Sequence, residues 1–215
     1  MIHKEQYISI KKDLLATKTI LVAVSKLQTI EKIKALYDLG ERNFGENYVQ
    51  ELCTKQEQLK ELNINWHFIG HLQRNKVKYI APFVHLIQSV DSLKLLKEIN
   101  KEAQKNKRII NCLLQIYIAK EESKFGLDEV ELTEIINEVN QGYLNNIKIS
   151  GLMGMASFSD NLAIVEQEFK YLKSIFDQFS NFEILSMGMS GDYELAIRCG
   201  SNMVRLGSSI FGARN

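Results

Sequence analysis

Apolar runs and helical repeats alternate along this chain from residue 19 onward. Residues 19–25 form a continuous apolar and β-branched run, which is typical of a strand buried on both faces of a parallel sheet. Residues 29–40 then carry apolar side chains at helical spacing and end at Gly40, a residue that favours a helix C-terminal cap. The pattern predicts a strand followed by a helix.

The same unit recurs to the end of the chain. The predicted strands cover residues 19–25, 43–47, 65–70, 85–90, 109–118, 147–155, 183–189 and 203–206. The predicted helices cover residues 29–40, 48–62, 72–80, a segment capped by Asp91 or Ser92 that ends near residue 105, then 128–140, 161–179 and 192–199. Little chain is left for a helix after the last strand, and residues 4–16 have the helical spacing to take its place.

Eight strands with crossover helices predict an α/β fold, a (β/α)8 TIM barrel that forms a single domain over residues 1–215. The alternative is an open, doubly wound parallel sheet. A single proline, Pro82, beside twelve glycines suits alternating strands and helices better than a sandwich of short strands.

Composition narrows the classes of function. Lys and Arg number 27 against 26 Asp and Glu, so no basic field recommends nucleic acid or an anionic membrane. No apolar stretch approaches the roughly 20 residues of a membrane span, and the polar N-terminus lacks the pattern of a secretory signal. Three widely spaced cysteines argue against a disulfide framework and a cysteine zinc site. We expect a cytoplasmic protein.

Lys26 directly follows the first predicted strand, and barrels of this class carry their active groups at strand C-terminal ends. Partial desolvation at the barrel mouth would lower the pKa of the lysine and free its amine to attack an aldehyde and form a Schiff base. The alternative is a lysine that extends from the strand end into solvent.

A Gly/Ser-rich turn, residues 186–192, follows the seventh predicted strand. Ser190 and Gly191 offer a hydroxyl and exposed backbone N–H groups ahead of a helix, a favourable place for a phosphate. The alternative is that Ser190 is only the helix N-cap, which Asp192 favours because its charge would compete with a bound anion.

A second such turn, within residues 205–212, follows the eighth strand. Gly207 and Ser208 offer further N–H donors and a hydroxyl, and the loops after strands 7 and 8 are the recurrent phosphate site of TIM barrels. Arg205 lies two residues earlier and would face either a ligand or a buried acid from a neighbouring strand. An aldehyde for Lys26, a phosphate for the turns and a ring nitrogen for Arg205 describe pyridoxal 5′-phosphate (PLP), whereas a phosphorylated sugar aldehyde would use only the first two.

Eight segments, in order from about residue 20 to the C-terminus, resemble the pyridoxal phosphate homeostasis protein family. They read VAVSK (22–26), NFGENYVQE (43–51), WHFIG (66–70), LQ (72–73), ESK (122–124), GLM (151–153), LSMGMS (185–190) and VRLGSSIFG (204–212). The resemblance implies a (β/α)8 barrel similar to the N-terminal domain of alanine racemase, with the cofactor held as an aldimine on Lys26. It implies Arg205 at the pyridine nitrogen, Asn47 near the ring, and around the phosphate Ser190, Gly191, Gly207 and Ser208.

An arginine at the ring nitrogen keeps that nitrogen unprotonated, so the ring withdraws electrons more weakly than in aspartate-paired enzymes. Racemisation also needs two acid/base groups, and barrel racemases bring the second from an extra domain. Because this sequence ends three residues after Gly212, we expect no such domain. The expectation is a non-catalytic PLP carrier that serves vitamin B6 homeostasis and passes cofactor to apo-enzymes. The alternatives are a PLP-dependent racemase-like enzyme and a cofactor-free Schiff-base aldolase.

Three smaller expectations complete the interpretation. Lys124 lies on the same mouth and would form a secondary aldimine as the cofactor enters or leaves. His67 and His71 could share one side of an extended segment, but His67 is expected to be a hydrogen-bonding residue at the barrel mouth rather than a zinc ligand. The helix-rich exterior leaves no spare apolar stripe, which suggests a monomer.

Overall fold

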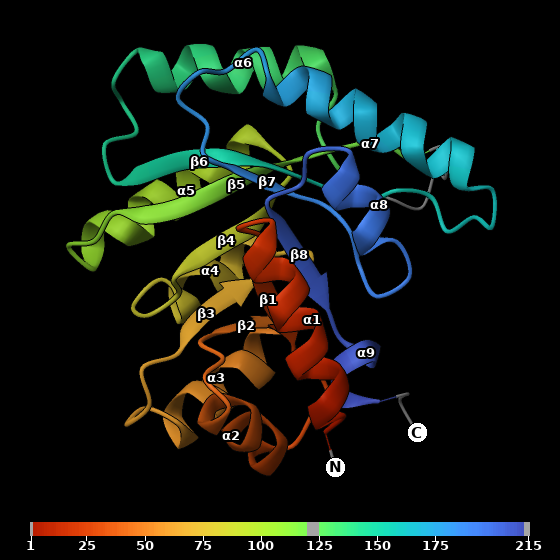
Figure 1. The fold of residues 1–215 in the computed structure, drawn as a ribbon. Coiled ribbons are helices and arrows are strands. Elements are labelled where there is room, and N and C mark those ends of the chain that lie inside the picture. The colour runs from red at the N-terminus through yellow and green to blue at the C-terminus, as the bar shows by residue number, and fades with distance from the viewer. Residues whose placement is uncertain (1, 120–124, 213–215) are drawn as a thin grey trace.

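A computed structural model of the chain describes residues 2–119 and 125–212. Its eight strands are all parallel and follow one another around a closed barrel in chain order (Figure 1). The barrel closes because β8 pairs with β1 over four residues, from Ile20 opposite Met203 to Ala23 opposite Leu206. The predicted (β/α)8 barrel is therefore confirmed, and the open-sheet alternative is wrong.

Each predicted strand is present, and most are shorter than predicted. The strands are β1 (Ile20–Val24), β2 (Asn43–Glu46), β3 (Asn65–Phe68), β4 (Leu86–Val90), β5 (Ile110–Ile116), β6 (Ile147–Gly154), β7 (Ile184–Ser186) and β8 (Met203–Leu206). The residues trimmed from the predicted C-terminal ends belong to the rim of the barrel, where the chain leaves the sheet to form loops.

The helices alternate with these strands. They are α1 (Lys4–Ala16), α2 (Ile30–Asp38), α3 (Val49–Gln58), the 3-10 turn η1 (Arg74–Lys76), α4 (Val77–Ile80), α5 (Leu93–Lys105), α6 (Glu129–Asn140), α7 (Leu162–Phe176), α8 (Tyr193–Arg198) and α9 (Ser208–Phe211). The helix predicted over residues 72–80 is thus split into η1 and α4. The four-residue α9 was not predicted, because its residues read as a glycine- and serine-rich turn.

Local capping explains where several helices begin and end. Gly40 adopts φ +98° after α2, and the amides of Gly40 and Glu41 donate to the carbonyls of Tyr37 and Leu36, which is a Schellman motif. At α5 the choice left open by the sequence falls on Ser92, whose hydroxyl accepts from the Leu95 amide at 3.3 Å.

The N-terminal helix covers the outside of the barrel where β8 meets β1, as predicted for residues 4–16. Tyr7, Ile10 and Leu14 of α1 are buried, and α1 packs against β1 and α9. The His3 amide ties the start of α1 to the Ile210 carbonyl at 2.8 Å. Helix α1 therefore supplies the eighth outer helix that α9 is too short to provide.

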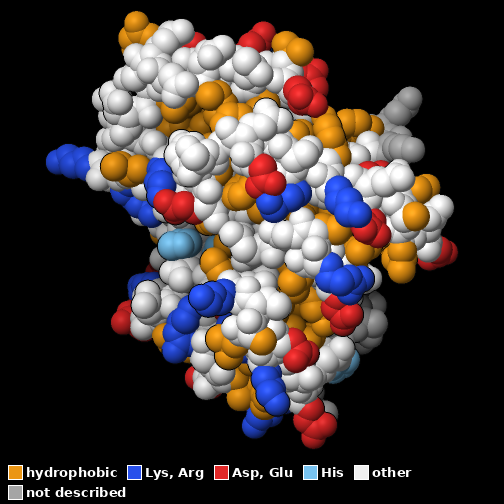
Figure 2. Space-filling model, turned by 45° about the horizontal axis from the view of Figure 1, so that its top comes forward, with side chains coloured by type: hydrophobic (Ala, Val, Ile, Leu, Met, Phe, Trp, Pro, Cys, Tyr) orange, Lys and Arg blue, Asp and Glu red, His pale blue; other side chains and the backbone are white. Residues whose placement is uncertain are grey.

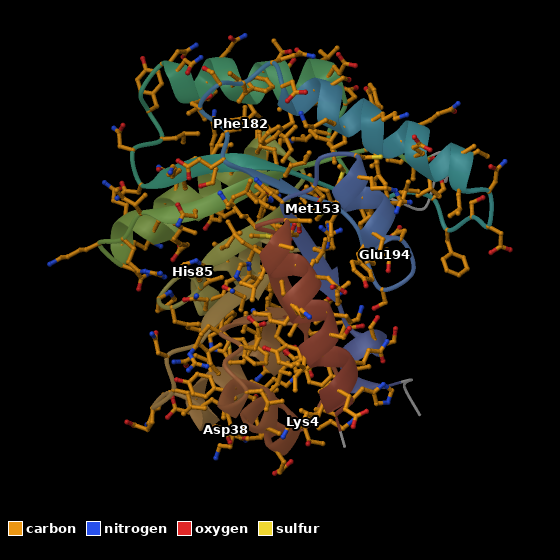
Figure 3. All side chains as sticks on the ribbon, viewed as in Figure 1. Lys4, Asp38, His85, Met153, Phe182 and Glu194 are labelled. Carbon is orange, nitrogen blue, oxygen red and sulfur yellow. The ribbon has the colours of Figure 1, made fainter. Side chains whose placement is uncertain are left out.

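Two apolar layers hold the structure together. Between barrel and helices lies a large continuous core, and inside the barrel lies a smaller cluster of Val22, Leu86, Leu113, Met153 and Met203; Figure 3 labels Met153 of this inner cluster. Because barrel strands are covered on both faces, most of their residues are buried, as the apolar run at β1 indicated.

The surface carries charges of both signs. Figure 2 shows Lys and Arg interspersed with Asp and Glu on one face, with hydrophobic side chains between them. Among the described residues, no helix combines the length and the apolar character that crossing a bilayer requires.

Candidate cofactor-binding site

A cavity of about 660 Å³ opens where the strands end. Parallel strands of a barrel finish at one rim, so residues that follow β1, β2, β6, β7 and β8 in the chain meet there. The seven residues predicted from the sequence all line this one cavity: Lys26, Asn47, Ser190, Gly191, Arg205, Gly207 and Ser208.

Lys26 stands in a tight turn at the end of β1. The Ser25 carbonyl accepts from the Gln28 amide at 3.0 Å, so Lys26 and Leu27 are the two central residues of a four-residue turn. Leu27 has φ +61°, a left-handed conformation that non-glycine residues adopt at a cost. Lys26 itself is half-buried and lines the cavity, rather than extending from the strand into open solvent.

Asn47 follows β2 directly and brings an amide to the cavity. Its Oδ1 is buried and has no hydrogen-bond partner among the described residues, and a buried polar atom in that condition is uncommon and costly. The position of its backbone depends on Gly70, because a Cβ added to Gly70 would lie 2.3 Å from the Asn47 carbonyl oxygen. Asn47 therefore lines the cavity with an amide side chain whose oxygen has no partner among the described residues.

Arg205 points inward from β8 and is only 4% exposed. Its guanidinium donates to the Ser186 carbonyl at 2.9 Å, to the Ser186 hydroxyl at 2.7 Å and to the Gly154 carbonyl at 3.0 Å. The alternative of an ion pair with an acid of a neighbouring strand is therefore wrong, since these partners are neutral. Burial lowers the pKa of Arg205 to about 10, an effect that nearby Asp192 opposes, and the group remains a cation at neutral pH.

A chain of buried hydrogen bonds runs from Arg205 across the inside of the barrel. The Ser186 hydroxyl donates to Gln88 Oε1 at 2.7 Å, and Gln88 Nε2 donates to His67 Nδ1 at 3.0 Å. His67 Nε2 then carries the proton and donates to Asn43 Oδ1 at 3.2 Å. Burial lowers the pKa of His67 to about 3, which keeps the ring neutral in this tautomer.

This chain corrects one prediction and shows two residues that were missed. His67 does form hydrogen bonds, but it lies inside the barrel rather than at its mouth. Ser186 and Gln88 were not singled out, although each is a buried polar residue in a short strand with apolar neighbours. A polar residue among apolar neighbours in a predicted buried strand could have indicated a functional or structural hydrogen bond.

The turns after β7 and β8 are joined to each other. The Gly207 amide donates to the Ser190 hydroxyl oxygen at 3.2 Å, so this amide is engaged within the protein rather than waiting as a free donor. Ser190 is not the N-cap of α8, because that position belongs to Asp192. Asp192 Oδ1 instead accepts from the Met189 amide at 2.6 Å and so closes the turn.

The loop after β6 supplies a wall of the cavity that was not predicted. Its lining residues are Met155, Ser157, Phe158, Ser159 and Asp160. Phe158 is 95% exposed, a large apolar side chain at the rim. The rule that active groups follow barrel strands applies to β6 as well, and it would have found this segment.

The two histidines of the zinc alternative are not brought together. His67 is buried inside the barrel, whereas His71 is exposed and bonds Asp91 Oδ2 at 3.0 Å. Within the described ranges, no group of three His, Cys, Asp or Glu residues is placed to hold a metal ion. Lys124, expected to act during cofactor entry or exit, lies outside the described residues.

Known proteins resemble this chain along most of its length. The family model for the N-terminal domain of alanine racemase matches residues 5–215. A Helicobacter pylori protein named pyridoxal phosphate homeostasis protein is 42% identical over 192 residues, which cover 89% of this chain and 86% of that relative.

Solved structures share the barrel. PipY of Synechococcus elongatus, solved with PLP bound, superposes with a TM-score of 0.89 at 31% identity and covers 97% of this chain and 99% of its own. Alanine racemase of Clostridium difficile superposes with a TM-score of 0.74 at 16% identity; the match spans 96% of this chain and 56% of the racemase, and it shows a shared fold. The chain therefore belongs to the alanine racemase N-terminal domain family, among the pyridoxal phosphate homeostasis proteins.

Proposed function

We propose that this chain binds PLP in the cavity at the strand ends, holds it through Lys26 without catalysing a reaction, and serves vitamin B6 homeostasis. The observation that carries the proposal is the meeting of seven residues in one cavity. They come from four separate strand ends and suit three different parts of one ligand. The name of the Helicobacter relative and the PLP bound to PipY support the same ligand.

The donor set fits PLP group by group. When bound, PLP supplies an aldehyde that reacts reversibly with amines, and Lys26 provides the amine. The hydroxyls of Ser190 and Ser208 and the backbone at Gly191 suit the phosphate, and the Gly207 amide would have to exchange its bond to Ser190 for one to the phosphate. Asn47 Oδ1, which lacks a partner among the described residues, suits a polar substituent of the ring.

Arg205 would determine how strongly the pyridine ring of PLP withdraws electrons. Three of its five N–H groups are bound to Ser186 and Gly154, so its side chain is oriented before the ligand arrives. As a cation at neutral pH, Arg205 would donate a hydrogen bond to the ring nitrogen without transferring a proton to it. The ring nitrogen would then stay unprotonated, and an unprotonated ring withdraws electrons only weakly.

The cavity wall also favours a carrier over a racemase. Its described titratable residues are Lys26, Asp160, Asp192 and Arg205. A two-base mechanism would therefore assign the second proton transfer to one of the aspartates. Asp192 already accepts the Met189 amide in the turn after β7. We infer a role in binding and release of PLP rather than in its chemistry.

The remaining parts of the proposal follow from this role. The chain acts as one PLP-binding domain over residues 1–215, as a cytoplasmic monomer, and apo-enzymes that need the cofactor are its partners. Nucleic acid and membranes are not among the proposed partners. Lys124 keeps its proposed role as a secondary amine during transfer.

An absorbance titration with PLP tests the proposal. After unbound PLP, which is itself yellow, is removed by gel filtration, wild-type protein is expected to keep a yellow absorbance band and Lys26→Ala to lack it, because only Lys26 brings an amine to this cavity among the described lining residues. The matched control is Lys101→Ala, which removes an exposed lysine of α5 and keeps the band.

Three results would count against the proposal. Colourless wild-type protein after PLP addition would overturn binding and favour the cofactor-free aldolase. A band that survives in Lys26→Ala would overturn the assignment of the lysine. Interconversion of alanine or serine enantiomers at about 1 s⁻¹ or faster would overturn the non-catalytic role.

A further inference from the structure

A buried cluster of charges lies directly behind the turn that carries Lys26. Its centre is Lys55 of α3, a lysine only 5% exposed. The Lys55 ammonium donates to the Ser25 carbonyl at 2.7 Å, to Glu46 Oε1 at 2.8 Å and to Glu51 Oε1 at 2.6 Å. These three bonds use all three N–H groups of the ammonium. Lys55 is thus a second lysine near the cavity, with its donors committed to the protein.

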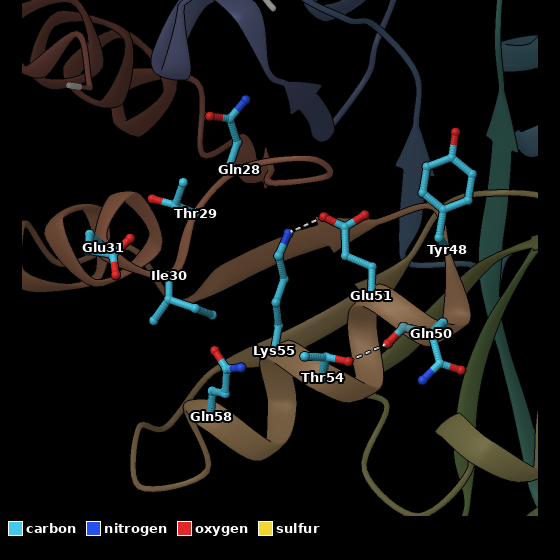
Figure 4. Close-up of a pocket in the computed structure, with 10 residues that line it drawn as sticks. All are labelled: Gln28, Thr29, Ile30, Glu31, Tyr48, Gln50, Glu51, Thr54, Lys55 and Gln58. Carbon is cyan, nitrogen blue, oxygen red and sulfur yellow. Dashed lines mark hydrogen bonds and ion pairs between the residues drawn. The ribbon is translucent and has the colours of Figure 1, made fainter.

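The same cluster holds the backbone on both sides of Lys26. On the preceding side, Lys55 binds the Ser25 carbonyl, and the Ser25 hydroxyl donates to Glu46 Oε1 at 2.5 Å. On the following side, the Leu27 amide donates to Glu51 Oε1 at 2.6 Å. One carboxylate oxygen of Glu51 therefore connects Lys55 to Leu27, and Figure 4 shows the Lys55 and Glu51 side chains meeting.

The turn needs such support because its backbone is unfavourable. Leu27 has φ +61°, at a position of the turn where glycine would be at ease. An extended Leu27 would break the turn between Ser25 and Gln28 that contains Lys26. The Leu27 side chain is exposed, so apolar burial does not hold the turn. The bonds from Lys55 and Glu51 are the observed restraints on either side.

We propose that Lys55 and Glu51 are positioning residues for Lys26. They hold a strained turn in the one conformation that presents the Lys26 amine to the cavity. The inference rests on the proposed function, because the benefit of a positioned amine is attachment to an aldehyde ligand. A pre-oriented amine gives up less conformational freedom when it reacts, so attachment is tighter and faster.

The surroundings of Glu51 make it suitable for mutation. Glu51 borders a second cavity, of about 640 Å³, between the start of α2 and helix α3 (Figure 4). Its side chain is 21% exposed there, whereas that of Glu46 is fully buried. Glu51→Ala therefore removes the bond to Leu27 while Lys55 keeps Glu46 and Ser25 as partners.

The first measurement is PLP affinity by absorbance titration of Lys55→Met and Glu51→Ala. Each is expected to bind PLP at least about tenfold more weakly than wild type. The control is Glu57→Ala, which removes an exposed carboxylate of the same helix, paired with Lys60, and leaves affinity unchanged. If Lys55→Met fails to fold, Glu51→Ala decides.

The second measurement uses the protein without cofactor. Hydrogen exchange of the Leu27 amide is expected to accelerate about tenfold or more in Glu51→Ala and to stay unchanged in Glu57→Ala. This readout reports the turn itself and needs no PLP.

The third measurement is rescue. The double variant Leu27→Gly/Glu51→Ala is expected to bind PLP at least about threefold more tightly than Glu51→Ala alone. Glycine adopts the left-handed conformation without the strain that Leu27 has there. A merely structural role of Glu51 would not respond to a glycine at this position.

The outcomes separate the inference from the proposed function. Wild-type protein that does not bind PLP overturns the proposed function. Wild-type protein that binds, with Glu51→Ala within about twofold of it, overturns the positioning role alone. Weakened binding in Glu51→Ala that Leu27→Gly does not improve also overturns the positioning role, because the effect then does not pass through the turn.

Discussion

Two buried clusters of polar side chains lie behind the cavity, and they differ in whether the central cation is paired with carboxylates. Behind Lys26, the Lys55 ammonium meets two carboxylates, Glu46 and Glu51. Behind Arg205, the guanidinium meets neutral groups of Ser186 and Gly154, and the bonds continue through Gln88. The first group contains its own compensating charges, whereas the second leaves a cation facing the cavity.

This difference indicates what each group is for. The charged cluster commits all three Lys55 donors and restrains a backbone, although Glu46 Oε2 has no partner among the described residues, so it acts on Lys26 from behind the turn. The neutral chain orients the Arg205 side chain without cancelling its charge, and that charge remains available to a ligand. Neutral acceptors orient the guanidinium without neutralising it, whereas a carboxylate partner would have neutralised its positive charge.

The largest expected effect comes from breaking the charged cluster on one side only. Lys55→Met leaves the Glu46 carboxylate buried without its cation, and we expect it to lower the free energy of unfolding by about 3 kcal/mol. Adding Glu46→Gln removes the stranded charge and should regain at least half of that loss. Urea unfolding of both variants measures the difference; equal losses in the single and double variants would show that the buried charge is not the cause.

A smaller effect, dependent on pH, is expected from the neutral chain. Burial lowers the pKa of His67 to about 3 in the folded protein, against 6.5 for an ordinary histidine. Between pH 6.5 and pH 3, His67 is protonated in the unfolded chain but not in the folded chain, so the free energy of unfolding falls as pH falls. Linkage gives about 1.4 kcal/mol per pH unit well below 6.5, or roughly 2 kcal/mol between pH 6 and pH 4.

The measurement is the unfolding free energy of wild type and His67→Gln at both pH values. The variant is expected to lose less stability on acidification by about that amount. His85, whose pKa burial also lowers and whose ring lies 5.5 Å from that of His67, is present in both proteins, so His85→Gln with and without His67→Gln separates the two histidines. Parallel pH profiles would contradict a neutral, buried His67.

The smallest expected effect is at the link between Arg205 and Gln88. Ser186→Ala removes one acceptor of Arg205 and the donor to Gln88, but the Ser186 and Gly154 carbonyls still hold the guanidinium. We expect a loss of about 1.5 kcal/mol in unfolding free energy. The matched control, Ser174→Ala on exposed α7, should be nearly neutral. A loss as large as that of Lys55→Met would remove the distinction between the two groups.

The sequence predicted the strand order and the cavity residues because both rest on local patterns. An apolar run such as residues 19–25 reports burial on two faces, and the residue that follows a barrel strand must lie at the rim. Lys26 and Arg205 could therefore be assigned to one rim before any coordinates, and the family resemblance added Asn47. Their roles toward PLP remain proposals, and they came with the family resemblance rather than with periodicity.

Contacts across the barrel could not be predicted in the same way. The alternatives for Ser190 and Arg205 both stayed open, because a hydroxyl or a guanidinium has many chemically acceptable partners. Nothing local indicates that Ser190 accepts an amide 17 positions away, or that Ser186 reaches Gln88 across 98 positions.

Composition and periodicity were sufficient for an eight-stranded barrel with an amine, an arginine and two serine-bearing turns at its rim, and the family resemblance added the amide of Asn47. They were sufficient because short runs of apolar residues indicate which segments are buried strands and where each strand ends. The folded chain alone decides that Lys55 stands behind Lys26 and that His67 is neutral inside the barrel. Both depend on which strands and helices face one another, and on the loss of water around buried charges, and neither is a property of a short stretch of chain.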